Sequence, residues 1–251
     1  MEPQTYKQLS DIEERHWWHK ARKSIIADYI KEMALPENAQ ILDIGCGPGG
    51  TTVSLTKWGA VHGLEKSEEA YAIVKKKYPS IHLTLGDGNQ AAKYYPNKKF
   101  DLITAFHVMY HKWIPDDAAF LKMVHEMLKP GGCILFTDPA YQILWRTSDI
   151  LDMGKSRYTL GYLQRLFTEA GFIVKKKRIY MASMFLPALA AALWDKFRSH
   201  NPDTQGLVSE MQVPPAGINL LLYWYCRIEV FLYKFIPLPL GIITVVSAKR
   251  I

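Results

Sequence analysis

The sequence predicts an α/β protein built on a doubly wound, mostly parallel sheet. Short apolar runs alternate with helical segments over the first 180 residues, and the first of these runs ends in a glycine-rich turn. Strands separated by helices form βαβ units, which require parallel strands and right-handed crossovers. The chain has 251 residues, 49% of them hydrophobic and 22% charged, which suits one globular core rather than a disordered or fibrous chain. We therefore expect one domain with an elaboration.

The elements of this fold can be placed in order along the chain. A helical region over residues 11–33 precedes the first strand. Strands are expected at 39–44, 61–65, 82–85, 100–106, 133–137, 172–180 and 242–249. Helices are expected from about Thr51 and over 68–77, 118–128 and 161–170. The chain then divides into an N-terminal helical lid (1–38), a core (39–180), a helical insertion (181–240) and the last strand (241–251).

The insertion is unusually apolar. Residues 186–197 and 220–235 carry aliphatic and aromatic side chains at helical spacing, so we expect two mostly buried helices that cap the sheet. The second helix is more apolar than capping requires. Three roles therefore remain possible for it: part of an acceptor pocket, a homodimer surface or a peripheral membrane contact. The basic residues around it suit an anionic membrane; they are Lys196, Arg198, Arg227 and Lys234. Residues 201–215, with three prolines, are expected to form a mobile loop.

Composition limits the compartment and the partners. The N-terminus is polar and acidic, without the apolar centre of a secretory signal, and Arg227 and Glu229 interrupt the most apolar stretch, so no spanning helix is expected. The three cysteines form no CxxC pair, so we expect reduced thiols in a cytoplasmic protein and no metal site. The net charge of +7 favours anionic partners in general. The lysine runs at 75–77 and 175–178 fit a helix end and an edge strand better than nucleic acid.

The glycine-rich turn indicates a cofactor site. Gly45, Gly47 and Gly50 have GxGxxG spacing between a strand and a helix, which lets a ligand approach the backbone closely. The same residues also read Asp-x-Gly-x-Gly-x-Gly, beginning at Asp43. A carboxylate at Asp43 would repel a pyrophosphate but can pair with an ammonium group. The loop therefore favours a cofactor that carries positive charge over a nicotinamide dinucleotide.

Four stretches together make the chain resemble the class I S-adenosylmethionine-dependent methyltransferases, in the small-molecule branch of the ubiquinone and menaquinone biosynthesis enzymes. They are the glycine loop with residues 61–66, Leu85-Gly-Asp-Gly88, residues 100–111, and Leu128-Lys-Pro-Gly-Gly before the next strand. The resemblance implies a Rossmann-like sheet with an antiparallel last strand, and S-adenosylmethionine as cofactor. It implies that Glu65 binds the ribose hydroxyls and Asp87 the adenine amine. The other core residues it implies in cofactor binding are Asp43, Gly45, Cys46, Gly47, Lys66, Gly88, Phe106 and His107.

A His-Trp-Trp-x-x-x-Arg segment begins at His16 and is similar to one found in a subset of these enzymes. That resemblance implies that Trp18 covers the donor site and that Arg22 pairs with the donor's carboxylate. Neighbouring tryptophans lie about 100° apart on a helix, so they cannot share one face. A helix docked on the sheet through aromatic packing alone is the alternative.

Methyl transfer needs alignment, exclusion of water and sometimes removal of a proton. His107 and His111 follow the expected strand at 100–106, at the edge where ligands bind in open α/β sheets, and either can act as a general base near neutral pH. His111 is the first candidate, with Tyr110 as a group that orients the acceptor. We therefore expect a methyltransferase for an O, N or C atom of a small, largely apolar acceptor. A sugar or lipid-linked glycan acceptor, and a non-catalytic S-adenosylmethionine-binding interaction protein, are the alternatives.

Overall fold

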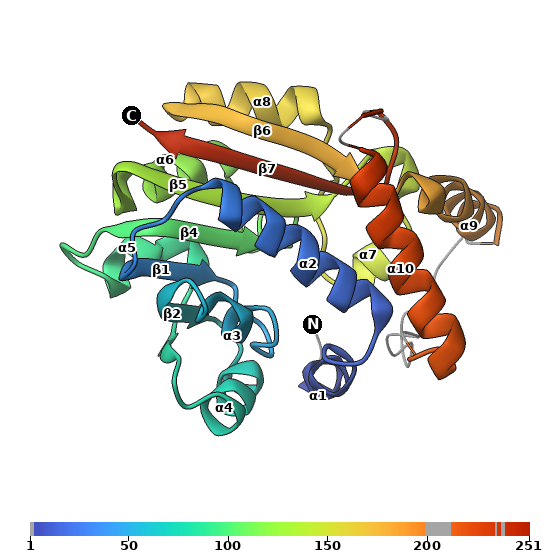
Figure 1. Ribbon diagram of the computed structural model, residues 1–251, viewed down its shortest axis with the longest axis horizontal. Helices are drawn as coiled ribbons and strands as arrows, with labels where there is room; N and C mark the ends of the chain where they lie inside the picture. Colours follow the sequence, from blue (N-terminus) through green and yellow to red (C-terminus); the bar gives the residue numbers. More distant parts are fainter. Residues whose placement is uncertain (1–2, 199–211, 234, 237–238) are drawn as a thin grey trace.

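The computed structural model describes residues 3–198, 212–233, 235–236 and 239–251, and its centre is one mixed sheet (Figure 1). The strand order across this sheet is β3-β2-β1-β4-β5-β7-β6, and only β7 runs antiparallel to its neighbours in the described chain. This confirms the predicted doubly wound sheet with an antiparallel last strand. The strands are β1 (Ala39–Ile44), β2 (Gly59–Glu65), β3 (His82–Leu85), β4 (Phe100–Phe106), β5 (Leu128–Pro139), β6 (Phe172–Tyr180) and β7 (Ile243–Arg250).

Helices cover both faces of the sheet (Figure 1). On one face α6 and α8 bury Phe120 and Phe167 against the strands, and on the other α2 buries Ile26 and Tyr29. The α-helices are α1 (Pro3–Ile12), α2 (Trp17–Glu32), α3 (Thr52–Leu55), α4 (Glu68–Lys77), α5 (Ala91–Tyr94), α6 (Asp117–Met127), α7 (Thr147–Leu151), α8 (Leu160–Glu169), α9 (Phe185–Arg198) and α10 (Ala216–Leu232). Short 3₁₀ turns occur at Gly88–Gln90, Gln142–Leu144 and Ala182–Met184.

Local sequence explains where several of these helices begin and end. Ser67 caps α4 by accepting a hydrogen bond from the Ala70 amide at 3.3 Å, and the helix ends in three lysines. Acidic residues at the start and lysines at the end complement the helix dipole. Because β6 is the outermost strand, the lysines at 175–177 lie on a sheet edge, where charge discourages pairing with another chain.

The N-terminal region contains two helices where the sequence predicted one. The chain leaves the helical path at residues 13–16, and the His16 ring accepts a hydrogen bond from the Trp18 amide that caps α2. The helix predicted from Thr51 has only four residues, because the chain turns into β2 at Gly59. Because of the break at 13–16, Glu13 lies against the glycine loop, where its carboxylate accepts a hydrogen bond from the Gly50 amide.

The insertion covers less of the sheet than predicted, with Cys226 and Tyr233 packed in the core beside β6 and β7. α10 packs on α2, where Arg227 forms an ion pair with Asp28 at 2.9 Å, and α2 already covers that face of the sheet. The expectation of mostly buried helices was therefore wrong: the side chains of Phe197 and Leu221 are 84% and 71% exposed. Most of the predicted mobile loop, residues 201–211, lies outside the described residues. Among the helices that are described, none combines the length and the apolar character needed to cross a membrane.

We expect Phe167→Ala to lower the free energy of unfolding by about 3–5 kcal/mol, because it leaves a cavity in the core under α8. Phe167 is fully buried and its ring lies 5.6 Å from those of Phe136 and Phe172. The same substitution at the exposed Phe197 should change this free energy by less than about 0.5 kcal/mol. Urea unfolding followed by circular dichroism measures both. Equal losses in the two variants would contradict the assignment of core and surface.

Candidate functional site

A cavity of about 750 Å³ opens at the carboxyl ends of β1, β2 and β4. In the strand order, β1 lies between β2 and β4, so the loops that follow β1 and β4 leave the sheet on opposite sides. Ligands bind at such switch points in open α/β sheets. The N-terminal parts of α1 and α2 complete the wall on the lid side.

The glycine loop forms the floor of this cavity. Gly45 has φ of +71°, and a Cβ atom there would lie 2.7 Å from Val108 Cγ2, so only glycine fits. Gly47 also has a positive φ, and its amide donates to Glu65 Oε2 at 2.7 Å. This hydrogen bond joins the loop after β1 to the end of β2.

Glu65 is the most heavily bonded acidic group on this wall. Besides Gly47, the amides of Lys66 and Ser67 donate to its Oε1 at 2.9 and 2.8 Å. Burial raises the pKa of Glu65, and the three amides oppose that shift. The carboxylate retains lone-pair capacity on Oε2, which accepts only one of these bonds.

Lys66 and Asp87 lie beside Glu65 along the same wall. Lys66 Nζ forms an ion pair with Asp87 Oδ2 at 2.9 Å, and Asp87 Oδ1 caps the turn at Gly88–Gln90 through the Asn89 amide. Asp87 thus carries a partner on each oxygen. Its carboxylate is fixed in direction at the end of β3.

Asp43 lies beneath the glycine loop with only 2% of its surface exposed. Its Oδ2 accepts a hydrogen bond from Thr52 Oγ1 and its Oδ1 one from Thr104 Oγ1, both at 2.6 Å. Burial raises the pKa of Asp43 to about 6. The carboxylate therefore ties β1 to β4 and to the start of α3.

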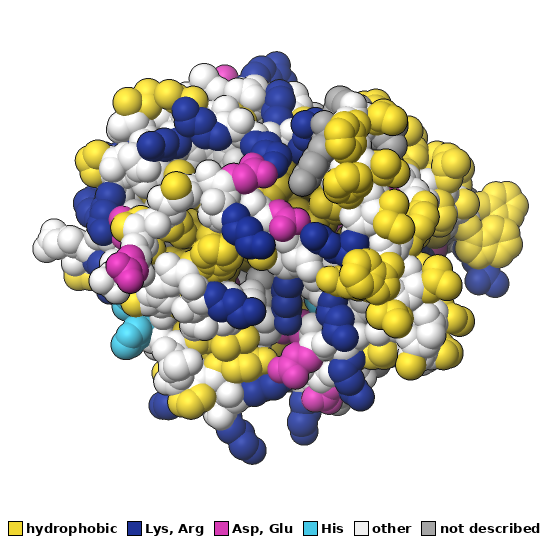
Figure 2. Space-filling view, in the orientation of Figure 1, with side chains coloured by type: hydrophobic (Ala, Val, Ile, Leu, Met, Phe, Trp, Pro, Cys, Tyr) yellow, Lys and Arg dark blue, Asp and Glu magenta, His cyan; other side chains and the backbone are white. Residues whose placement is uncertain are grey.

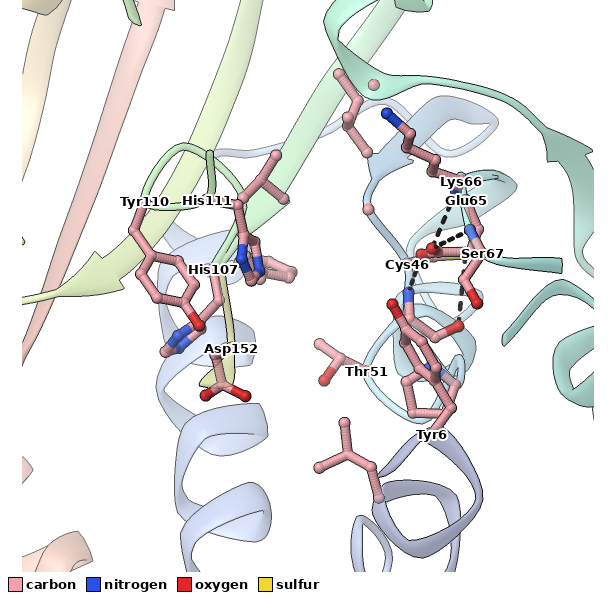
Figure 3. A pocket seen from close by; sticks show the side chains of 18 of the residues that line it. Tyr6, Cys46, Thr51, Glu65, Lys66, Ser67, His107, Tyr110, His111 and Asp152 are labelled. Atoms are coloured by element: carbon pink, nitrogen blue, oxygen red, sulfur yellow. Dashed lines mark hydrogen bonds between the residues drawn. The ribbon is translucent and has the colours of Figure 1, made fainter. Parts of the chain in front are cut away.

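The lid contributes polar groups that sequence reasoning missed. The Tyr6 hydroxyl from α1 hydrogen-bonds the Ser67 side chain, and burial and Glu65 raise its pKa to about 12 (Figure 3). His19 lines the cavity with both ring nitrogens lacking partners among the described residues, and burial lowers its pKa to about 2. Trp18 lines the cavity, whereas the amide of Trp17 bonds Asn219 of α10. Both tryptophan side chains pack against the core under α2, and their rings lie 6.0 Å apart.

The opposite wall carries His107, Tyr110, His111 and Asp152, which lie together across the cavity from Glu65 and Ser67 (Figure 3). His107 has φ of +59°, a conformation that costs a non-glycine residue about 1 kcal/mol or more. The loop after β4 is held against residues 149–155, because the Lys155 amide donates to the Tyr110 carbonyl at 2.6 Å.

Burial dominates the protonation of this wall. It lowers the pKa of His107 well below its ordinary value and that of His111 to about 4, so both imidazoles are neutral at pH 7. Burial, with the nearby carboxylate of Asp149, raises the pKa of Asp152 to about 6. The nearby Tyr110 hydroxyl opposes this rise in the pKa of Asp152. Asp152 is therefore the group on this wall whose pKa lies closest to neutrality.

Every site residue predicted from the sequence lines this one cavity. They are Trp18, Arg22, Asp43, Gly45, Cys46, Gly47, Glu65, Lys66, Asp87, Gly88, Phe106, His107, Tyr110 and His111. The structure adds Tyr6, Glu13, His19 and Asp152. Glu13 and His19 flank the His-Trp-Trp segment, which could have drawn attention to them, but nothing local marks Tyr6 or Asp152. Cys46, Cys133 and Cys226 are free thiols.

The sheet order and the glycine-loop cavity define a Rossmann-like enzyme that binds a nucleoside cofactor. A family model described as a methyltransferase domain matches residues 17–177. The chain belongs to this methyltransferase domain family, which confirms the predicted class of enzyme and indicates S-adenosylmethionine as its cofactor.

Two curated relatives are named for steps of quinone biosynthesis. The chain is 30% identical over 132 residues to demethylmenaquinone methyltransferase of Lysinibacillus sphaericus, covering 47% of this chain and 55% of the relative. It is 27% identical over 132 residues to ubiquinone biosynthesis O-methyltransferase of Coxiella burnetii, covering 48% and 56%. The alignments thus span little more than half the length of these relatives.

A solved structure supports the fold. The chain is similar to a SAM-dependent methyltransferase from Archaeoglobus fulgidus with a TM-score of 0.59, over 92% of this chain and 94% of that one. The sequences are 15% identical, so this likeness concerns the fold alone.

We expect Glu65→Gln to weaken binding of S-adenosylhomocysteine roughly 10- to 100-fold, because it replaces a charged acceptor that three amides orient toward the cavity. Calorimetric titration measures the affinity. Glu169→Gln, at the last residue of α8, is the control and should bind like the unchanged protein. Unaltered affinity in Glu65→Gln would exclude a role for this carboxylate in donor binding.

Proposed function

We propose that this protein transfers a methyl group from S-adenosylmethionine to an oxygen, nitrogen or carbon atom of a small, largely apolar acceptor. One observation carries this proposal: the wall formed by the glycine loop and the wall that carries His107 and Asp152 face each other across one cavity (Figure 3). When bound, S-adenosylmethionine supplies a methyl carbon that its sulfonium already activates. The protein then has to align the acceptor, exclude water and, for a hydroxyl acceptor, take up a proton.

The residues present fit such a donor. Glu65 retains acceptor capacity for ribose hydroxyls, and Asp87 lies at the end of the neighbouring strand for the adenine amine. The positive-φ glycines leave the backbone open to the ligand. Arg22 is buried in the lid and its Nε lacks a partner among the described residues. Cys46, Lys66, Gly88 and Phe106 complete the proposed donor wall.

Aromatic and aliphatic lining supports an apolar acceptor. Trp18, Trp113 and Ile114 contribute to the cavity on the side of the β4 loop and the lid. The two relatives are named as a demethylmenaquinone methyltransferase and a ubiquinone biosynthesis O-methyltransferase, which favours an acceptor of the quinone class. A sugar or glycan acceptor has only the His-Trp-Trp segment in its favour. A non-catalytic binding protein would have no need for the neutral histidines and Asp152 opposite the donor wall.

We assign the proton-accepting role to Asp152, with His107, Tyr110 and His111 as the groups around the acceptor. A base is most effective when its pKa lies near the working pH, and the pKa of about 6 for Asp152 meets this better than that of about 4 for His111. The side chains of Tyr110 and Asp152 lie together on this wall of the cavity (Figure 3). His111, the first candidate from the sequence, becomes a neutral hydrogen-bonding partner for the acceptor.

The activity is tested with methyl-labelled S-adenosylmethionine and two probe acceptors, demethylmenaquinone and a prenylated catechol. Transfer to either probe supports the proposal. Binding of S-adenosylhomocysteine without transfer to either probe, and with label appearing only in a water-soluble sugar fraction or nowhere, would overturn the apolar acceptor class.

The pH dependence of kcat identifies the base. A base must be deprotonated, so activity should fall as the pH drops through about 6 if Asp152 accepts the proton. We expect Asp152→Asn to lower kcat by about 100-fold or more and to abolish this acid limb. His111→Asn should keep the limb near pH 6 with a smaller loss. A limb near pH 4 that disappears in His111→Asn would assign the base to His111 instead.

The exposed face of α9 and α10 supports peripheral contact with an anionic membrane. Hydrophobic side chains gather over both helices (Figure 2), and the exposed ones include Leu186, Leu193, Trp194, Phe197, Leu220, Leu221, Trp224 and Ile228. The acidic side chains of these helices are engaged: Asp195 bonds Arg146, and Glu229 accepts bonds from residues 182 and 183. Lys196 and Arg198 lie in the last turn of α9, and the Arg198 guanidinium lies 5.2 Å from the centroid of the Trp194 ring, so both can supply positive charge beside lipid phosphates. An apolar face with cations beside it is typical of helices that lie in a bilayer interface.

We expect the protein to sediment with vesicles that contain phosphatidylglycerol and to be released by salt, since lipid phosphates contribute part of the attraction. Replacing both Phe197 and Leu221 with serine should abolish sedimentation, because each removes an exposed apolar anchor. Ile173→Ser, on the exposed part of β6, is the matched control and should not. A homodimer that the double substitution dissociates, with no vesicle binding by the unchanged protein, would show that this face binds a second copy.

A further inference from the structure

Glu13 places a buried carboxylate on the glycine loop. It lies in the break between α1 and α2 with 4% of its surface exposed, and its Oε2 accepts a hydrogen bond from the Gly50 amide at 2.8 Å. A Cβ atom at Gly50 would lie 2.2 Å from this oxygen, so the glycine is what allows the carboxylate to approach. The contact spans 37 positions of sequence and joins the lid to the start of α3.

Arg22 faces the same carboxylate with spare hydrogen-bonding capacity. Its Nη2 donates to Thr51 Oγ1 at 3.0 Å and lies 3.8 Å from Glu13 Oε1, which is too long for a hydrogen bond. Its Nε has no partner among the described residues. Burying two charged groups is unfavourable unless their remaining donors and acceptors find partners. Both side chains line the cavity, so a ligand can supply those partners.

The amino-acid end of a ligand would supply hydrogen-bond partners for Glu13 and Arg22. Glu13 Oε1 accepts no hydrogen bond from the described residues and has Arg22 as its nearest cation at 3.8 Å, so a donor from a ligand fits there, and an anionic acceptor fits beside Arg22. An α-ammonium and an α-carboxylate on one carbon supply both at that spacing. Asp43, which the sequence favoured for the ammonium, already accepts a threonine hydroxyl on each oxygen.

We propose that Glu13 and Arg22 together bind the zwitterionic end of the methyl donor, with Glu13 accepting from its ammonium and Arg22 donating to its carboxylate. This inference rests on the proposed use of S-adenosylmethionine. It makes Glu13 a specificity residue, because it distinguishes a donor with an intact amino-acid end from one without it. It also means that the donor ties α1 and α2 to the glycine loop.

Two nucleosides test this assignment by calorimetric titration: S-adenosylhomocysteine, which has the amino-acid end, and 5′-methylthioadenosine, which lacks it. Glu13→Gln should weaken binding of S-adenosylhomocysteine roughly 10- to 100-fold and leave that of methylthioadenosine unchanged, since only the former loses a charged hydrogen bond. Glu14→Gln is the matched control, because Glu14 is exposed and pairs with Lys77 outside the cavity. It should bind both nucleosides like the unchanged protein.

A second variant tests the same contact in case Glu13→Gln fails to fold. Gly50→Ala puts a methyl group where the Glu13 carboxylate rests, and it should reproduce the selective loss, while unchanged binding of methylthioadenosine shows that the cavity is still folded. Equal losses for both nucleosides, or no loss for either in Glu13→Gln, would overturn the role of Glu13. Failure of the unchanged protein to bind either nucleoside would instead overturn the proposed function.

Discussion

The hydrogen bonds of Asp43 to two threonine hydroxyls are the constraint on which the site depends. Asp43 is buried at the end of β1, where the strand order reverses, and it joins β4 through Thr104 and α3 through Thr52. A buried carboxylate without partners would be costly, so these bonds hold the three elements at fixed separation. The loop between them has to leave the sheet in a tight, glycine-rich path, and this path opens the cavity.

The two walls of the cavity follow from that arrangement. On one side the Gly47 amide bonds Glu65, so the glycine loop and the end of β2 form one surface. On the other, the loop after β4 is held by the segment at 149–155, which brings Asp152 beside Tyr110. Donor and acceptor groups therefore come from elements that the sheet keeps apart, and in-line transfer requires them to face each other across a gap.

Local pattern was sufficient for the sheet and for much of the donor wall. The strands at 82–85, 100–106 and 172–180 begin and end where apolar alternation and turn residues predict, and the glycine loop and Glu65 sit at fixed places relative to them. Contacts between segments far apart in the sequence could not be predicted from local patterns of residues. Glu13 reaches Gly50, and Asp152 reaches Tyr110, only after folding. The exposure of α9 and α10 was missed because their apolar spacing is the same whether they pack on a core or face outward.

Hydrogen bonds connect the exposed helices α9 and α10 to the segments that bound the cavity. Asp195 of α9 bonds both the Arg146 side chain and the Thr147 amide at the start of α7, the helix that leads to Asp152. Asn219 of α10 accepts from the amide of Trp17, next to the tryptophan that lines the cavity. Whatever covers the proposed membrane face would therefore act, through Asp195 and Asn219, on the segment before Asp152 and on the start of α2, which both border the cavity.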